Sequence, residues 1–221
     1  MAPMMHRARL NVWLVIVSVA AVAFALVAWP RDGGNPFRAY ATAALVPGEG
    51  LGDLRVGETT LGPFIERYGV GRPSALYGDE TALAFSFDRA GLTFEFMLSG
   101  ACAEAVQRMH GTGLRALRSP RAFNRDHPVC VGARLGRVEL VAGGSERTTF
   151  WGGETPSGVR LRMEREAALE RLGADRDPRW GTEEAMPWRW YDVPGLAVWF
   201  APDRSDPRGE RWIVTRLEVR P

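Results

Sequence analysis

An internal repeat is the feature that most constrains the fold of this chain. Residues 64–96 and 168–200 align without a gap at a constant offset of 104. Nine of the 33 aligned pairs are identical, where roughly two are expected by chance at ordinary residue frequencies. The first copy closes with FDRAGLTFEF and the second with YDVPGLAVWF. The repeat predicts that the chain builds the same helix-plus-hairpin unit twice.

Helix signals open each copy of the repeat. In the first copy Phe64 and Tyr68 lie four residues apart on one apolar helix face, and Gly69 ends the helix. In the second copy the predicted helix covers residues 164–172 and ends at Gly173. Both helices precede a segment that alternates between apolar and polar residues, which is the pattern of a half-buried strand.

The alternating segments predict a β-hairpin in each copy, with four residues in each loop. The predicted strands and loops are 83–87, 88–91 and 92–97 in the first copy, and 188–191, 192–195 and 196–200 in the second. A four-residue loop in the second hairpin places Trp188 directly across from Trp199.

A further strand is expected after each hairpin, at residues 129–141 and 211–219. Apolar positions in the first of these change parity at Gly136, which predicts a β-bulge there. The element order indicates an α+β fold in which helices cover one face of an antiparallel sheet. We expect two related units of this kind, at residues 53–118 and 119–221.

The N-terminal part of the chain resembles a membrane segment. Residues 10–29 are 20 residues without a charge, enough for a helix to cross the roughly 30 Å hydrocarbon core. His6, Arg7 and Arg9 precede them, so the N-terminus should stay cytoplasmic. Residues 1–30 are therefore a single-pass anchor or, alternatively, a cleaved signal peptide. Both readings place residues 31–221 outside the cytoplasm, as for a periplasmic domain, with residues 31–52 as a Pro- and Gly-containing tether.

The charge balance argues against nucleic acid as a partner. All 28 basic residues are arginines, and after the first 30 residues the chain holds 26 arginines and 26 acidic residues. A nucleic-acid-binding domain usually has a strongly basic face. We therefore expect a membrane contact through residues 10–29 and a protein partner, but no nucleic acid.

Short motifs at the start and end of these elements carry a family resemblance. They are Val56-Gly57-Glu58-Thr59, Tyr68-Gly69 with Pro73 following, Gly91, Leu172-Gly173 with Pro178 following, Trp190-Tyr191 and Gly195-Leu196. Between residues 54 and 219 the chain resembles a tandem of SmpA/OmlA units, the fold of BamE-like and beta-lactamase-inhibitor-like envelope proteins. The resemblance implies a non-enzymatic envelope protein that binds other proteins or lends them structural support.

The two hairpins differ on the face that turns away from the predicted core. The first hairpin places six apolar residues inward and only small or polar residues outward. In the second, the outward face holds Trp188, Trp190 and Trp199, and the last strand adds Trp212 with Val214. Tryptophan dominates interface hot spots, so these four tryptophans are the predicted partner-binding residues. The alternative is that the first unit or the loop 143–156 covers them.

Cys102 and Cys130 are the only cysteines. In an exported domain they predict a disulfide, and two buried thiols are the alternative. Together with His110 and His127 they could form a metal site, but the Cys102 to His110 spacing is not a familiar zinc pattern. No metal ion and no cofactor is predicted.

Enzymatic signals are weak. His110 and His127 are the only histidines of the exported part, and no G-x-S-x-G motif supplies a serine nucleophile. We therefore expect a membrane-tethered, non-enzymatic binding or structural module of the cell envelope. The alternative function is an envelope hydrolase that uses His127 with an acidic partner.

Overall fold

The computed structural model describes residues 35–76, 81–110, 120–142, 151–174, 179–180 and 189–221. The chain divides into two compact units, residues 1–35 and 36–221, and the described helices and strands all lie in the second unit. The predicted membrane segment, residues 10–29, lies outside the described ranges. Within those ranges no helix has the length and apolar character needed to cross a membrane.

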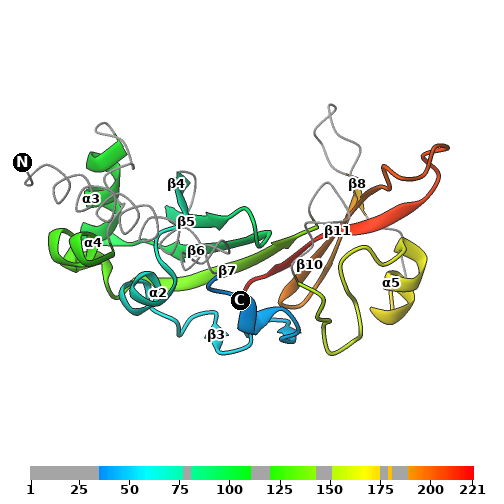
Figure 1. Ribbon diagram of the computed structural model, residues 1–221, viewed down its shortest axis with the longest axis horizontal. Helices are drawn as coiled ribbons and strands as arrows, with labels where there is room; N and C mark the ends of the chain where they lie inside the picture. Colours follow the sequence, from blue (N-terminus) through cyan, green and yellow to red (C-terminus); the bar gives the residue numbers. More distant parts are fainter. Residues whose placement is uncertain (1–34, 77–80, 111–119, 143–150, 175–178, 181–188) are drawn as a thin grey trace, which may run out of the picture. The chain divides into compact units, whose positions relative to one another are not determined.

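The second unit is α+β and is built on one large antiparallel sheet (Figure 1). Within the described ranges its eight strands follow the order β4-β5-β6-β7-β11-β10-β9-β8. Their bounds are β4 (Arg72–Leu76), β5 (Ala82–Phe87), β6 (Leu92–Met97), β7 (Arg134–Val141), β8 (Arg179–Trp180), β9 (Arg189–Val193), β10 (Leu196–Pro202) and β11 (Trp212–Val219). Two four-stranded meanders therefore meet at β7 and β11, which pair with each other.

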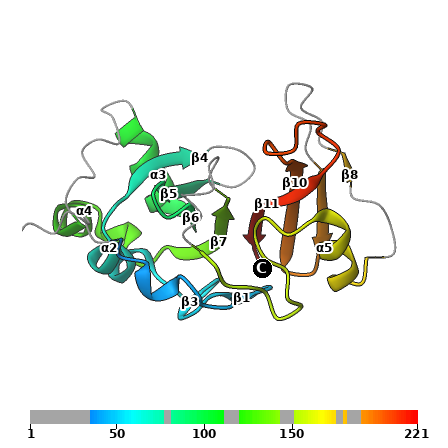
Figure 2. The same cartoon turned by 45° about the vertical axis from the view of Figure 1, so that its right-hand side comes forward.

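Four helices of the described part contribute to the hydrophobic core on one side of this sheet (Figures 1 and 2). They are α2 (Leu61–Tyr68), α3 (Gly100–His110), α4 (Pro120–Asp126) and α5 (Arg165–Arg171). Phe64 of α2 packs its ring 4.9 Å from that of Phe94 and 5.0 Å from that of Phe96 on β6. Ala168 of α5 is fully buried in the same cluster. We call the side of the sheet that faces this cluster the first face, and its opposite side the second face.

Residues 36–52, predicted as a tether, are folded. A 3₁₀-helix (Arg38–Tyr40) is followed by a small sheet of β1 (Leu45–Val46), β2 (Gly50–Leu51) and β3 (Leu54–Arg55). Phe37, Leu45 and Leu51 are completely buried in the core cluster. The prediction was wrong because three isolated apolar side chains among Pro and Gly show no periodicity, yet each fills the core.

A polar cluster fastens this N-terminal segment to α2. The Tyr40 hydroxyl donates to Asp53 and shares a hydrogen bond with the Tyr68 hydroxyl. Arg67 binds the other oxygen of Asp53 at 3.0 Å. Burial, and then the bond to Asp53, raise the pKa of Tyr40, whereas the bond from Tyr40 lowers the pKa of Asp53. The carboxylate therefore stays ionised while the phenol stays neutral.

The first hairpin has the predicted register and the second does not. In the first, Phe87 pairs with Leu92 across the four-residue loop. In the second, Val193 pairs with Leu196, so only Pro194 and Gly195 form the turn. This shift of two residues keeps each side chain on its predicted face, because the pleat has a period of two. It brings Trp190, and not Trp188, opposite Trp199.

The turn of the second hairpin also contacts the β1–β2 turn. Gly195 has φ +74°, and its carbonyl accepts a hydrogen bond from the Gly48 N–H at 3.0 Å. A Cβ at Gly195 would lie 2.3 Å from the Gly48 nitrogen. Only glycine fits this close approach of two backbones.

Each meander has a bulge. The register between β6 and β7 shifts between Glu95 and Phe96, and Gly136 is the extra residue, as predicted. The register between β10 and β11 shifts between Trp199 and Phe200. This second bulge was not predicted, and it reverses the expected faces at the start of β11. Val214 pairs with Phe200 and is completely buried, and Trp212 packs against the core cluster.

The boundary predicted between the two repeat units, after residue 118, also changes. Residues 128–130 form a 3₁₀-helix, so the strand predicted from residue 129 begins at Arg134. That strand, β7, pairs with β6 of the first meander. The first meander therefore ends after Val141 and not at residue 118.

Candidate functional site

An ionic network crosses the centre of the second face. It links five side chains from three neighbouring strands in the order Glu95, Arg137, Glu218, Arg216 and Glu139. Arg137 lies 3.3 Å from Glu95 and 3.5 Å from Glu218. Arg216 lies 2.7 Å from Glu218 and 2.9 Å from Glu139. Because Glu139 and Glu218 pair directly across β7 and β11, Arg216 offsets a repulsion between like charges.

The carboxylates of this network are buried more deeply than the arginines. The Glu95 and Glu218 side chains are only 8% and 4% exposed, whereas those of Arg137 and Arg216 are 37% and 30% exposed. Burial raises the pKa of Glu95 and of Glu139 above the ordinary glutamate value, although the arginines act in the opposite direction. Among these five residues three carboxylates share two guanidinium groups, so the network holds one more negative than positive charge when it is fully ionised.

A pair of tryptophans lies on the second face next to the network, on β9 and β10. Trp190 and Trp199 are partly exposed, and their rings stack with centroids 5.7 Å apart. The Arg216 guanidinium lies 4.7 Å over the Trp199 ring on the other side. Asp192 accepts hydrogen bonds from the Trp190 indole at 3.2 Å and from Arg220 at 2.7 Å. A cation–indole–indole stack therefore joins the ionic network to β9 of the second meander.

The four tryptophans predicted to share one face do not all lie there in the structure. Trp190 and Trp199 share the second face, as predicted. Trp188 lies outside the described residues. Trp212 was placed on the wrong face, because the bulge in β11 turns it to the first face, where Arg189 lies 5.1 Å over its ring. Of the three predicted tryptophans that the structure describes, two therefore belong to the site on the second face.

Part of the loop expected to cover the tryptophans packs elsewhere. The buried Trp151 donates its indole N–H to the carbonyl of Ala43 at 2.9 Å. Gly152 and Glu154 form backbone hydrogen bonds with Ala41 and Leu45. Residues 151–156 are thus fixed against the N-terminal segment, whereas residues 143–150 lie outside the described ranges.

The cysteines form a disulfide. Cys102 of α3 and Cys130 are joined, with their Cα atoms 4.9 Å apart. The disulfide leaves no thiolate for the metal site that the sequence made conceivable, and the part of the chain that the structure describes holds no cluster of three metal-ligating side chains.

His127 lies in a shallow groove beside this disulfide. Ala101, Ala105, Arg108, Asp126, His127, Pro128 and Val129 line the groove. The neighbouring carboxylate of Asp126 is bound by Arg125 at 2.8 Å, and the imidazole packs 5.3 Å from the Phe123 ring. Within the described ranges no carboxylate forms a hydrogen bond with the His127 ring.

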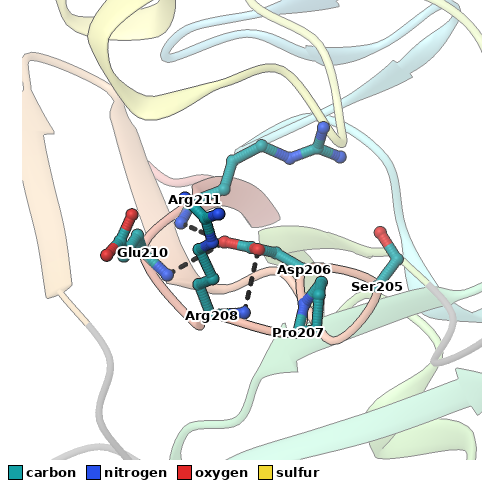
Figure 3. Close-up of a pocket in the computed structure, with 6 residues that line it drawn as sticks. All are labelled: Ser205, Asp206, Pro207, Arg208, Glu210 and Arg211. Atoms are coloured by element: carbon teal, nitrogen blue, oxygen red, sulfur yellow. Dashed lines mark hydrogen bonds between the residues drawn. The ribbon is translucent and has the colours of Figure 1, made fainter.

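A second hollow lies in the β10–β11 loop. Its lining residues are Ser205, Asp206, Pro207, Arg208, Glu210 and Arg211. Figure 3 shows the Asp206 carboxylate at its centre, where it accepts backbone N–H groups of Arg208, Glu210 and Arg211 at 3.1, 2.9 and 2.8 Å. These bonds lower the pKa of Asp206. The carboxylate organises its own loop, so we assign this hollow a structural role.

Comparison with protein-family models, with curated proteins and with solved structures finds no match to the chain. The site therefore rests on its own geometry. Sequence patterns placed Trp190 and Trp199 on one face but paired Trp199 with Trp188, and they missed the ionic network. Four of its residues lie in R-x-E segments at 137–139 and 216–218, but the same pattern also occurs at 162–164 and 208–210, so it does not single them out.

Proposed function

We propose that the chain is a membrane-tethered, non-enzymatic binding module of the cell envelope, and that a protein partner docks on the second face of its sheet. The observation that carries this proposal is the stack of Arg216, Trp199 and Trp190, which is partly exposed and adjoins a fixed ionic network. Tryptophan and arginine are the residues that most often dominate binding energy at protein interfaces.

The surroundings of the stack suit a binding surface. Asp192 and Arg216 hold the two indoles in place from either side, so little side-chain freedom remains to be lost when a partner binds. The ion pairs beside the stack fix the positions of charges that a partner must match, and matched charges favour specificity and correct orientation. The combination supports recognition of one partner surface over nonspecific adhesion.

We further propose that the two meanders are related units that arose by duplication. Three correspondences support this proposal. The carbonyls of Gly91 and Gly195 each accept a hydrogen bond from a residue at the end of the last strand of their own meander. The two bulges follow Glu95 and Trp199, which are equivalent at the offset of 104. The R-x-E segments of β7 and β11 lie side by side, and each arginine reaches a glutamate of the other strand.

The two meanders differ in the side chains that they place on the second face. In the first meander Ala84 pairs with Glu95 on the second face. In the second meander Trp190 pairs with Trp199 at the corresponding place. The SmpA/OmlA resemblance rests on short motifs of both meanders, and Trp190 is part of one of them. The tryptophan pair belongs to one meander only, which favours a role acquired after duplication.

For residues 1–30 we propose a single-pass membrane anchor that leaves residues 31–221 outside the cytoplasm. The uncharged run of residues 10–29 and the arginines before it support this proposal. Mass spectrometry of the N-terminus of the membrane-extracted protein tests it, because a signal peptide would be missing from the mature chain.

Photocrosslinking in cells tests the docking surface. A photoreactive residue in place of Ala201, which lies on β10 two residues from Trp199, should yield a discrete larger species. The same substitution at Glu170, an exposed residue of α5, is the matched control and should not. A Trp190→Ala/Trp199→Ala variant should abolish the adduct.

Chemical modification separates docking from burial. If the second face is open, N-bromosuccinimide should oxidise Trp190 and Trp199 in the isolated folded chain, and bound partner should protect them. Absence of any adduct from position 201, together with tryptophans that resist oxidation in the isolated chain, would show that the chain covers this face itself.

A further inference from the structure

The connection between β6 and β7 is an insertion that the second meander lacks. Residues 99–133 hold α3, α4, the 3₁₀-helix Pro128–Cys130 and the disulfide, whereas β10 and β11 are joined by a short loop. We call residues 99–133 the helical insertion. The second meander forms its four strands without such an element. The insertion is therefore not needed to build a meander and is available for a separate function.

The even charge balance of the chain conceals a segregation of charge. The helical insertion contains five arginines and two acidic residues, whereas the rest of residues 36–221 contains 20 arginines and 23 acidic residues. The insertion is therefore the basic part of an otherwise acidic unit. Charge segregated in this way attracts an anionic surface at a distance of about one Debye length, roughly 8–10 Å in physiological salt.

The described part of the insertion holds three of its five arginines and both of its acidic residues, Glu104 and Asp126, together with an exposed apolar residue. Arg108, Arg121 and Arg125 are exposed, and the Arg125 side chain is 77% exposed although it also binds Asp126. Val129 is 55% exposed and is the one large hydrophobic side chain with high exposure among the described residues. Arg108 and Val129 line the same groove. Exposed arginines and an exposed aliphatic residue on the same insertion match the two parts of the interfacial region of a bilayer, which has anionic phosphates above apolar chains.

A short linker keeps the folded unit close to the membrane. This step rests on the proposed anchor at residues 1–30. Because Phe37 is already buried in the core, only residues 30–35 separate the apolar run from the folded unit. A chain of that length spans at most about 25 Å. The folded unit must therefore stay near the headgroups of the bilayer.

We propose that the helical insertion docks on anionic phospholipid headgroups, with Arg108, Arg121 and Arg125 on the phosphates and Val129 entering the interface. Arginine binds phosphate through two parallel N–H groups and keeps its charge at every physiological pH. The disulfide holds α3 to the 3₁₀-helix, so the arginine of one and the valine of the other keep a fixed spacing. A docked insertion would orient the second face of the sheet relative to the membrane.

The test uses the full chain in lipid nanodiscs of either phosphatidylcholine alone or phosphatidylcholine with about 30% phosphatidylglycerol, a composition that gives the bilayer a negative surface potential. Photoreactive p-benzoylphenylalanine replaces Val129, and mass spectrometry measures the phospholipid adduct. We expect a severalfold higher adduct yield in the anionic discs. The triple variant Arg108→Gln/Arg121→Gln/Arg125→Gln should reduce it to the phosphatidylcholine level, since each arginine near an anionic surface is worth about fivefold in binding.

A matched variant removes the same charge elsewhere. Arg89→Gln/Arg160→Gln/Arg204→Gln replaces three exposed arginines outside the insertion and should keep the adduct yield. Salt at about 0.5 M should remove the difference between the two lipid compositions by screening. Equal yields in both kinds of disc, or an equal loss in both triple variants, would overturn the proposal.

Two further outcomes are distinguishable. If the chain does not co-elute with nanodiscs, the proposed anchor fails. Flotation of the same chain with anionic vesicles then decides on the insertion, and no flotation overturns the proposal. A short DNA duplex that binds the parent chain and not the Arg108/Arg121/Arg125 variant, without any lipid effect, would assign the surface to nucleic acid and also overturn it.

Discussion

Replacement of Arg216 by glutamine should destabilise the fold more than any other single change in the ionic network. Among the described residues Arg216 is the one cation paired with Glu139 and the nearer of two cations beside Glu218. Loss of one partner of a buried ion pair costs about 3–5 kcal/mol, because the remaining charge is left unpaired. The Arg216 side chain is 30% exposed, so we expect a loss near the lower end, about 3 kcal/mol, with any loss of the Trp199 contact included.

Arg137→Gln is the matched control within the same network. Its side chain is 37% exposed and its contacts with Glu95 and Glu218 are longer, at 3.3 and 3.5 Å. Glu95 loses its ion pair in this variant, but the longer contacts are weaker. We therefore expect a smaller loss than for Arg216→Gln, about 2 kcal/mol.

The effect of Arg216→Gln should also depend on pH. Burial raises the pKa of Glu139 above its ordinary value of about 4.3. A carboxyl with a raised pKa favours the folded state below the unfolded-state pKa, and that contribution is lost as the pH rises through the folded-state pKa. Protonated Glu139 is neutral, so its burial no longer requires the positive charge of Arg216. The loss should therefore be largest near neutral pH and should shrink as the pH falls toward the ordinary glutamate range.

Urea unfolding followed by tryptophan fluorescence measures these differences as free energies of unfolding at neutral pH and at about pH 5. A double-mutant cycle with Glu139→Gln isolates the coupling between the two side chains. A loss below about 1 kcal/mol for Arg216→Gln, or a loss that does not change with pH, would refute the argument that Arg216 neutralises buried carboxylates.

Local geometry supports three further predictions. Gly195→Ala should cost at least about 2 kcal/mol, because its Cβ would meet a neighbouring turn at a backbone with φ +74°. Gly173→Ala, at φ +62° with open space around it, should cost only about 1 kcal/mol in the same unfolding assay. Paired substitution of Cys102 and Cys130 by alanine should lower stability by about 3.5 kcal/mol for a sequence separation of 28, and an unchanged unfolding midpoint would contradict this. Tyr40 should remain protonated above about pH 10, where exposed tyrosines ionise; its stabilising contribution is lost only as the pH rises further, and ultraviolet absorbance of tyrosinate measures this directly.

Local sequence patterns predicted the elements of this fold well. Period-two alternation identified both hairpins, and the change of parity at Gly136 located a bulge. The second hairpin failed in register because its loop was assumed to match the first, whereas Pro194-Gly195 forms a two-residue turn. The error did not move Trp190 from its face, because a shift of two residues preserves the pleat.

Features that depend on distant pairing could not be predicted. The face of Trp212 depends on a bulge that is visible only once β10 and β11 are paired. The ionic network requires β7 to lie against β11, and nothing local specifies that neighbour. Phe37 fills the core although its own surroundings lack any periodic pattern.

The pairing of β7 with β11 has a consequence for biosynthesis. Roughly 70 residues separate the two strands, so β7 becomes available for folding before its partner does, whether it emerges from a ribosome or is exported across a membrane. Until then it is the exposed edge of the first meander, open to pairing with another chain. Arg137 and Glu139 lie on that edge, and charged side chains disfavour the pairing of an exposed strand with another chain. The side chains that join the two halves of the finished sheet thus also protect the unfinished one from aggregation.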